Sequence, residues 1–277
     1  MQTNKLLALV AGLALATTAT AGDDFGLWGE AAVEKKINKQ FSIDAALGFR
    51  AEENAARASR YDASLGATWK VNKYFRMGAG YVYLYSRSPR EVKAKYREDD
   101  DGRPVAGADG RPVYQGYNVD HAFYRSKHRV YVEAVGKVKA GRFEFSLRER
   151  YQFTHYMSAE TLRDRYRVGA DPTDHTVAGY EETVTDFKPA KDKHYLRSRL
   201  QVAYDIANCP VEPFVSYELS NDLTSTFALD KTRLRAGADW KVSKQHKLSL
   251  AYVFEDGADD DDGNRLHAIE VGYKFDF

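Results

Sequence analysis

The chain has 277 residues, and its 41 Lys and Arg are balanced by 40 Asp and Glu to a formal net charge of +1. A nucleic-acid-binding protein would show a clear basic excess, so this balance argues against such a partner. The mean hydropathy is −0.58, and no long apolar stretch follows residue 21, which excludes helical membrane spans beyond that point. An aromatic content of 13% is nevertheless high for so charged a protein.

Residues 1–21 predict a secretory signal peptide. Lys5 precedes the apolar run LLALVAGLALA, and the small residues Ala19-Thr20-Ala21 follow it, as in a cleavable signal. The run is shorter than the roughly 20 residues of a spanning helix, so a retained anchor is the less favoured alternative. Without residues 1–21 the chain keeps 40 basic and 40 acidic residues. Its single cysteine, Cys209, cannot form an internal disulfide.

Apolar and polar residues alternate along FSIDAALGFR (41–50), where Phe41 and Leu47 share one side while Asp44 and Arg50 share the other. Such alternation over about ten residues predicts a β-strand. Ten further segments have this period, near 25–34, 60–70, 75–85, 122–138, 142–155, 194–206, 211–221, 232–242, 246–256 and 264–277. Strands that alternate lipid-facing and lumen-facing residues average to neutral hydropathy. We therefore expect an all-β protein, an antiparallel transmembrane β-barrel of about 10–12 strands over residues 22–277.

The connections between these segments alternate between short and long. Tight turns are expected near 35–40, 71–74, 139–141, 207–210 and 243–245, and long polar loops near 53–58, 87–121, 156–193, 222–230 and 257–263. Outer-membrane barrels have short periplasmic turns and long extracellular loops. A soluble β-sandwich gives the same alternation, but its exterior would be crowded with paired charges. Eleven segments conflict with the even strand number usual in bacteria, so either a strand is missing or 25–34 is not an ordinary wall strand.

A family resemblance follows from motifs spread over the mature chain. They are Trp28, GFR (48–50), SRY (59–61), HRVYVEAVGKVKAGRFEFSLRERYQF (128–153), HYLRSRLQVAYDI (194–206), PFVSYELSND (213–222), TRLRAGADWKVSKQHKLSLAY (232–252) and HAIEVGYKF (267–275). Together they resemble the uncharacterised outer-membrane β-barrels of Bacteroidota catalogued as domain-of-unknown-function family 2490. The resemblance implies a barrel in the cell outer membrane of a Gram-negative bacterium, in contact with its lipid and lipopolysaccharide. It implies no activity.

The chain ends in a complete alternating segment. Tyr273, Phe275 and Phe277 lie on its apolar side. We expect this segment to close the barrel against the first strand. These three residues also resemble the carboxy-terminal signal that the barrel-assembly machinery binds, which would make that machinery a partner.

Charged residues gather on the side of the strands that would face the lumen. Charges that cannot face lipid must pair with one another or contact water. An arginine-lined pore would select anions, whereas a salt-bridged core would fill the barrel, and a barrel of 10–12 strands allows either. The predicted pore-lining residues are Arg50, Arg60, Arg76, Arg148, Arg150, Arg197, Arg199, Glu218, Arg233 and Arg235.

Two other functions are alternatives to a channel or a passive structural barrel. Asp192 and His194, with Asp99 and Asp101, resemble the acid–base pairs of omptin proteases, so an omptin-like or lipid-modifying hydrolase is one. A protein that binds a partner through loops 87–121 and 156–193 is the other. The acidic runs EDDDG (98–102) and DGADDDDGN (256–264) lack the acid spacing of a calcium loop, and the histidines near 156–193 lack metal-ligand spacing. We therefore expect no metal, no cofactor and no enzymatic step.

Overall fold

The computed structural model describes residues 24–169, 176–224, 226–257 and 265–277. The predicted signal peptide, residues 1–21, lies outside these ranges. Within them no helix is long and apolar enough to span a membrane. The strands are β1 (Asp24–Lys36), β2 (Phe41–Glu52), β3 (Arg57–Lys70), β4 (Phe75–Ser88), β5 (Glu91–Tyr96), β6 (Tyr114–Asp120), β7 (Phe123–Ala140), β8 (Phe143–Tyr156), β9 (Ala159–Val168), β10 (Ala178–Lys188), β11 (Lys191–Tyr204), β12 (Val211–Asp222), β13 (Ala228–Lys241), β14 (His246–Gly257) and β15 (Arg265–Asp276).

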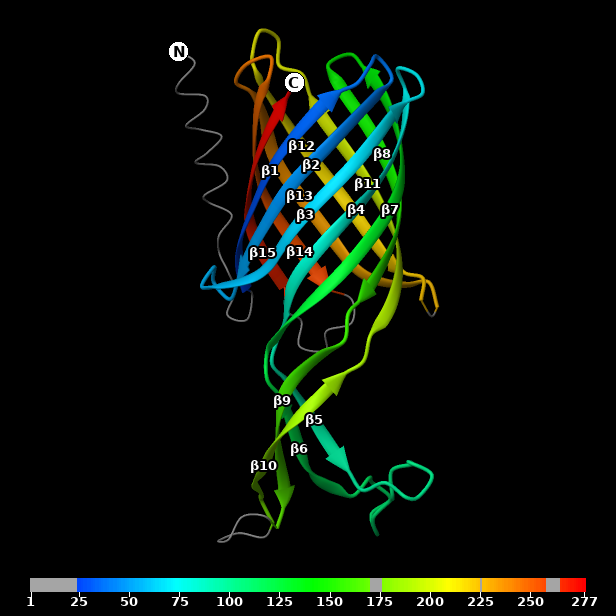
Figure 1. The fold of residues 1–277 in the computed structure, drawn as a ribbon, viewed down its shortest axis with the longest axis vertical. Coiled ribbons are helices and arrows are strands. Elements are labelled where there is room, and N and C mark those ends of the chain that lie inside the picture. Colours follow the sequence, from blue (N-terminus) through cyan, green and yellow to red (C-terminus); the bar gives the residue numbers. More distant parts are fainter. Residues whose placement is uncertain (1–23, 170–175, 225, 258–264) are drawn as a thin grey trace. The chain divides into compact units, whose positions relative to one another are not determined.

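These strands form two compact units. Among the described residues, the first contains those up to Tyr85, Lys127–His155 and Asp192–Phe277, and the second contains Ser86–Ser126 and Tyr156–Lys191. The first unit is a closed barrel with the strand order β1-β15-β14-β13-β12-β11-β8-β7-β4-β3-β2 (Figure 1). The second is a four-stranded sheet with the order β10-β9-β6-β5.

The barrel has eleven strands, within the predicted range, and the way it closes explains the odd number. Strands β1 and β15 pair in parallel, from Asp24 opposite Leu266 to Glu34 opposite Asp276. Strand β1 also pairs antiparallel with β2. With an odd number of alternating strands, the first and the last run in the same direction. The expectation of a purely antiparallel barrel is therefore corrected at this one seam, and segment 25–34 is a wall strand.

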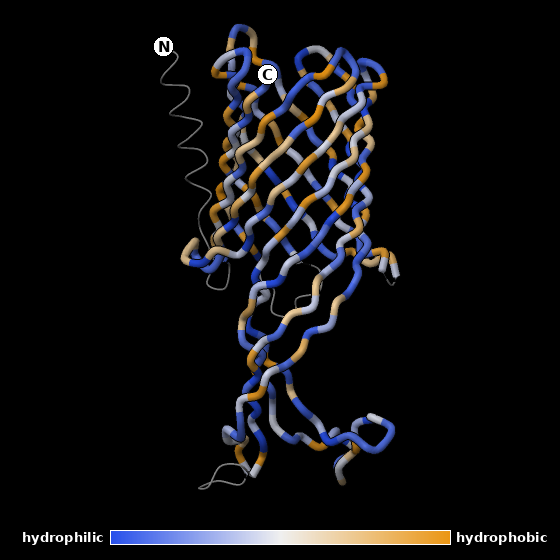
Figure 2. Tube along the Cα trace, in the orientation of Figure 1, coloured by the Kyte–Doolittle hydropathy of each residue, from blue (hydrophilic) through white to orange (hydrophobic). Residues whose placement is uncertain are grey.

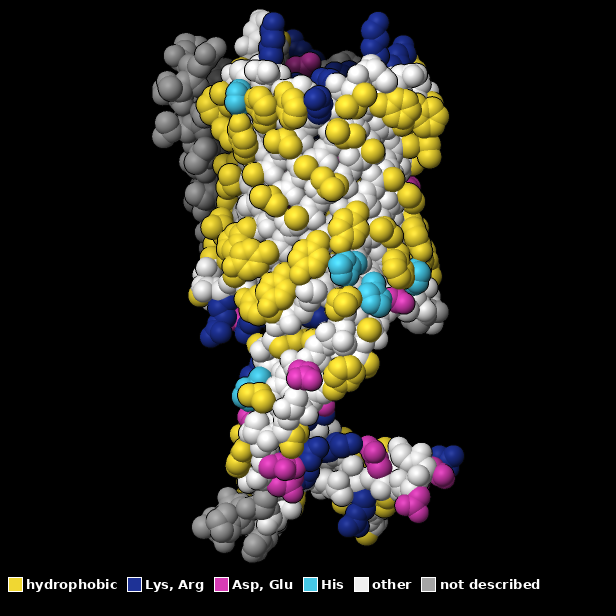
Figure 3. All heavy atoms as spheres, in the orientation of Figure 1, with side chains coloured by type: hydrophobic (Ala, Val, Ile, Leu, Met, Phe, Trp, Pro, Cys, Tyr) yellow, Lys and Arg dark blue, Asp and Glu magenta, His cyan; other side chains and the backbone are white. Residues whose placement is uncertain are grey.

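The two faces of the barrel strands differ as the alternation predicts. Leu47, Leu65 and Val215 are exposed on the outer wall, with exposed fractions of 67%, 64% and 52%. Hydrophobic and hydrophilic residues alternate along the strands (Figure 2), and hydrophobic side chains cover the barrel wall on the face seen in Figure 3. An apolar outer face of this extent suits a lipid environment, since soluble monomers rarely expose large contiguous apolar patches.

The second unit lies where long polar loops were expected, at 87–121 and 156–193, and contains the strands β5, β6, β9 and β10. One face of the sheet is aromatic: the rings of Tyr117 and Tyr166 stack at 4.5 Å, and Tyr180 packs edge-on against Tyr166. Gly116 has a φ of +131°, and an added Cβ would lie 2.0 Å from the backbone oxygen of Tyr166. Only glycine therefore fits at this irregular position beside β9.

The opposite face of this sheet is charged. Asp120 of β6 is 2% exposed and accepts hydrogen bonds from Arg163 of β9, at 2.5 Å, and Lys188 of β10, at 2.5 Å. Asp186 of β10 lies 2.7 Å from Arg163 and 2.8 Å from Lys188. Two carboxylates and two cations thus connect three of the four strands.

Candidate functional site

All ten residues predicted to line the pore lie on barrel strands. Glu218 is buried, Arg76 is exposed, and the other eight arginines are partly buried. They come from seven strands: Arg50 from β2, Arg60 from β3, Arg76 from β4, Arg148 and Arg150 from β8, Arg197 and Arg199 from β11, Glu218 from β12, and Arg233 and Arg235 from β13.

Glu218 is the centre of a charge network in the lumen. Its carboxylate lies 2.5 Å from Nη2 of Arg148 and 3.3 Å from Nη1 of Arg233. It also accepts hydrogen bonds from Arg197, one of them from Nε at 3.1 Å. The side chain of Glu218 is only 6% exposed. One carboxylate therefore holds guanidinium groups from β8, β11 and β13 together, in the space the strands enclose.

Other acids extend this network around the lumen. Glu133 accepts hydrogen bonds from Arg150 at 2.8 and 2.6 Å. Glu255 accepts one from Nε of Arg233 at 2.8 Å and one from Lys231 at 3.0 Å. Asp62 pairs with Arg60 at 2.6 Å, and Glu270 pairs with Arg235. Six of the nine predicted arginines thus form ion pairs.

An aromatic side chain occupies the lumen beside the network. Trp28 of β1 is 3% exposed and packs with Val253 and Ala268. The guanidinium of Arg50 lies 3.6 Å from its ring centroid, and that of Arg233 lies 5.1 Å away. An indole ring close to two cations is a favourable cation–π arrangement. Trp28 entered the sequence analysis only through the family resemblance, and its position shows that it helps to fill the barrel.

Three predicted arginines, Arg50, Arg76 and Arg199, form no ion pair with any described residue, and Arg50 lies against the ring of Trp28 instead. Arg199 of β11 lies opposite Glu218 of β12 in the strand register but forms no ion pair with it. In addition, the Nε atoms of Arg148 and Arg235 are buried without a hydrogen-bond partner among the described residues. The lumen therefore keeps guanidinium donors that are not used by carboxylates.

Sequence reasoning missed two members of the network, Glu255 and Lys231. Glu255 lies near the end of the predicted segment 246–256. Leu248 and Leu250 are 37% exposed on the outer wall, whereas Ala251 and Val253 are fully buried. This alternation places Glu255 with the inward residues, so the signal was present in the sequence.

Histidines and tyrosines form a repeated contact between neighbouring barrel strands. The hydroxyl of Tyr81 shares a hydrogen bond of 2.6 Å with Nδ1 of His128, and Tyr151 shares one of 2.7 Å with His194. Each histidine also packs against the aromatic residue two positions after its tyrosine. The remaining copies are Tyr252 with His267, and Tyr273 with His246 at 2.8 Å.

Three of these histidines, His128, His194 and His267, lie near the beginning of strands entered from the long connections, and His246 begins β14 after a short turn. Trp69, at the end of β3 beside a short turn, stacks on Phe41 with ring centroids 6.0 Å apart. Aromatic residues with a polar group are typical of both edges of a membrane-spanning band. The outer wall thus has such residues near both ends.

The residues of the hydrolase alternative lie in different surroundings from those expected. Oδ1 of Asp192 lies 2.6 Å from Nδ1 of His155, whereas His194 contacts Tyr151. Asp99 accepts hydrogen bonds from backbone amides in its own turn, including that of Arg103 at 2.9 Å. No group of three potential metal-ligating side chains occurs among the described residues. His175 and most of the acidic run 256–264 lie outside them. Whether the chain has an enzymatic activity stays a prediction.

A closed β-barrel with an apolar outer wall and a charged interior defines the structural class. Residues 25–266 match the family described as "Protein of unknown function (DUF2490)", and the chain belongs to this family. No curated protein matches it.

The solved structures similar to the chain include two autotransporter domains. The beta domain of the Bordetella autotransporter BrkA is 12% identical, with a TM-score of 0.49 over 87% of this chain and 86% of that one. The translocator domain of autotransporter NalP from Neisseria meningitidis is also 12% identical, with a TM-score of 0.46 over 93% of this chain and 89% of that one.

Proposed function

We propose that this chain is an outer-membrane β-barrel that forms a narrow, anion-preferring channel. The observation that carries the proposal is the guanidinium of Arg199, which forms no ion pair with any described residue and lies in a lumen narrowed by paired arginines and acids. Rings of arginine side chains select anions in channels of known type. The proposal includes no enzymatic step.

The outer wall supports the membrane part of the proposal. It is apolar and has aromatic and histidine contacts near both ends, such as Tyr151 with His194 and Tyr273 with His246. We infer that the short turns face the periplasm and that the long connections face the outside. The contacts would then include lipid and lipopolysaccharide, and Tyr273, Phe275 and Phe277 would bind the barrel-assembly machinery. The assignment to Bacteroidota stays a prediction.

The network around Glu218 limits the size of any solute. A buried carboxylate that holds three guanidinium groups leaves little free cross-section, so large solutes are excluded and only small ions would pass. Any ion that passes meets the charge of Arg199, which no acid pairs among the described residues. This positive group favours a small anion over a cation.

The test is the conductance of the refolded full chain in a planar lipid bilayer, measured under a salt gradient. The wild type is expected to pass chloride in preference to potassium. Arg199→Gln should lower the chloride-to-potassium permeability ratio at least twofold, because it removes the unpaired charge. Arg199→Lys is the matched control, since it keeps the charge, and its ratio should stay near that of the wild type.

Two results would reject the channel. One is a barrel that is folded, as judged by its heat-dependent mobility on an electrophoresis gel, but is electrically silent; it would support the passive structural alternative. The other is a preference for cations. A permeability ratio that changes equally in Arg199→Gln and Arg199→Lys would show that the charge of Arg199 does not set the selectivity.

A further inference from the structure

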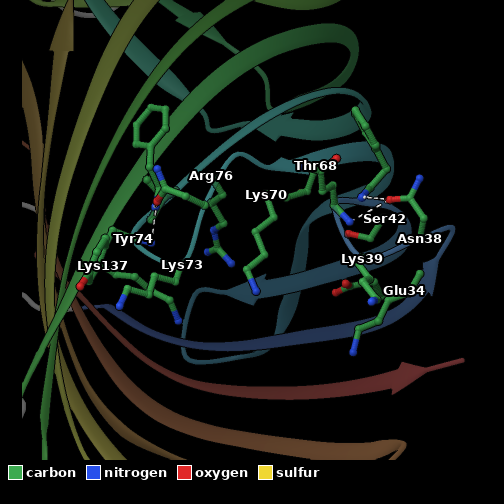
Figure 4. A pocket seen from close by; sticks show the side chains of 16 residues that line it. Glu34, Asn38, Lys39, Ser42, Thr68, Lys70, Lys73, Tyr74, Arg76 and Lys137 are labelled. Carbon is green, nitrogen blue, oxygen red and sulfur yellow. Dashed lines mark hydrogen bonds between the residues drawn. The ribbon is translucent and has the colours of Figure 1, made fainter.

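A cavity of about 450 Å³ lies at the short-turn end of the barrel, between the turn that joins β1 to β2 and the turn that joins β3 to β4. Cationic side chains from two turns and four strands surround it. Figure 4 shows the amino and guanidinium ends of Lys70, Lys73 and Arg76 pointing into the same space. The cations that line it are Lys36, Lys39, Lys70, Lys73, Arg76 and Lys137.

Acids do not balance these charges. Glu34 is the one carboxylate among the residues that line the cavity, and it already pairs with Lys274 of β15. Of the six cations, Lys137 lies 3.4 Å from Glu144. The other five form no ion pair with any described residue. Like charges held this close repel one another, and a concave site of one sign attracts and concentrates ions of the opposite sign.

The turns hold two of these lysines in equivalent positions. The side-chain oxygen of Asn38 accepts hydrogen bonds from the amides of Gln40 and Phe41, each at 2.8 Å. That of Asn72 accepts them from Tyr74 and Phe75, at 2.8 and 2.9 Å. Such contacts fix a tight turn. The residue after each asparagine is the lysine of the cavity, Lys39 or Lys73.

A third turn has the same design but lies outside the cavity. The hydroxyl of Ser243 accepts hydrogen bonds from the amides of Gln245 and His246, both at 3.1 Å, and Lys244 follows it. Lys244 does not line the cavity. The pattern Lys-Ile/Val-Asn/Ser-Lys thus occurs at 36–39, 70–73 and 241–244. The turn at 241–244 can therefore serve as a control for the two turns at the cavity.

We propose that this cavity binds a small multivalent anion that carries phosphate or carboxylate groups. A single negative charge would leave most of the five unpaired cations unbalanced, whereas several charges on one molecule would contact cations from both turns. The volume is within the range of small-molecule sites. The amides of Asn38 and Asn72 add neutral donors at the edge, because only their oxygens are used in the turns. The inference goes beyond the channel, since binding here does not require conduction.

The test is titration calorimetry on the refolded full chain in detergent, with inorganic tripolyphosphate and citrate as probes and monovalent acetate for comparison. The double variant Lys39→Gln/Lys73→Gln should weaken binding of the multivalent probe at least tenfold. Lys244→Gln removes the equivalent lysine of the third turn and should change the affinity less than twofold. Raising the salt concentration should weaken wild-type binding, because the contacts are electrostatic.

The probes also identify the ligand chemistry. Binding of tripolyphosphate but not citrate supports a phosphate ligand, the reverse supports a polycarboxylate, and either agrees with the proposal. It is overturned if neither probe binds, if acetate binds equally well, or if Lys244→Gln weakens binding as much as the double variant. A barrel that conducts no ions but binds tripolyphosphate would contradict the channel proposal and support the binding site. A barrel that conducts ions but binds neither probe would support the channel and contradict the binding site.

Discussion

Replacing Glu218 by glutamine is expected to lower the free energy of unfolding of the barrel by about 3–5 kcal/mol, the usual cost of breaking a buried ion pair on one side. The glutamine has nearly the same shape, so packing hardly changes. It would leave Arg148, Arg197 and Arg233 with no negative charge between them, each mostly buried in the lumen. Arg233 keeps Glu255 as a partner, and Arg148 keeps Glu133 at 4.0 Å, so most of the loss falls on Arg197.

Glu212 provides the matched control on the same strand. It lies 3.1 Å from Lys241, but the two side chains are 30% and 58% exposed. An exposed pair contributes only about 0–1 kcal/mol, so Glu212→Gln should be close to the wild type. The measurement is urea unfolding of the refolded barrel, followed by tryptophan fluorescence. Equal losses in the two variants would show that Glu218 is not the central acid of the lumen.

A double-variant cycle tests whether the network acts as a unit. Arg197→Gln combined with Glu218→Gln should cost less than the sum of the two single changes, because each single change leaves an unpaired charge. Directly contacting residues usually show a coupling of about 0.5–3 kcal/mol. Additive effects would mean that Arg197 contributes little through Glu218, despite their hydrogen bonds.

The barrel strands were predictable because the residues of each strand alternate between an apolar outer side and a polar inner side. Leu65 and Trp69 face outward while Asp62 and Lys70 have the other parity, and this holds without knowledge of any neighbouring strand. The parallel pairing of β1 with β15 was not predictable in this way. Which edges of a sheet meet depends on the whole chain, and the one sign in the sequence was the odd number of segments.

The strands of the second unit were missed although they also alternate. In β5, Val92 and Tyr96 share one side and Lys93 the other; in β9, Tyr166 is flanked by Arg165 and Arg167. Their high charge, and the turn-forming repeat DGRPV at 101–105 and 109–113 between β5 and β6, favour loops when the sequence is considered alone. The charged side chains form ion pairs between neighbouring strands of the sheet. Their high polarity therefore did not mean that the segments lack regular secondary structure.

The candidate site was predictable in position but not in pairing. Parity placed Arg148, Arg197 and Glu218 on the inward side. Their contacts, however, depend on the register of strands that are far apart in sequence: β8 and β12 are not neighbours, yet Arg148 reaches Glu218 across β11. The cationic cavity at the short-turn end could not be predicted, because only the folded barrel brings Lys39 and Lys73 together.

Replacing Asp120 by asparagine is expected to destabilise the four-stranded sheet by about 3 kcal/mol, because Arg163 and Lys188 would share only Asp186. Limited proteolysis at pH 7 measures this: cleavage within Ser86–Ser126 should become much faster, while the barrel keeps its heat-dependent gel mobility. Glu182→Gln is the control, since Glu182 pairs with Arg165 at 2.6 Å with both side chains well exposed. Equal protease resistance in all three proteins would contradict the role of Asp120.

The pH dependence of the same experiment isolates the charge of Asp120. The hydrogen bond from Arg163, helped by Lys188, lowers the pKa of Asp120 from 3.8 to about 2. A lowered pKa stabilises the fold at pH values above that of the unfolded chain, and this stabilisation disappears as the pH falls through the folded value. The displacement of the pKa corresponds to about 2–3 kcal/mol, which is most of the loss expected for Asp120→Asn. The protease resistance of the wild type should therefore exceed that of Asp120→Asn by the full amount at pH 5 and above. The two resistances should converge between pH 4 and 2, because a protonated aspartate and an asparagine both lack charge. The other carboxyl groups titrate in both proteins, so a difference that persists unchanged at pH 2 would assign the loss to packing rather than to the carboxylate.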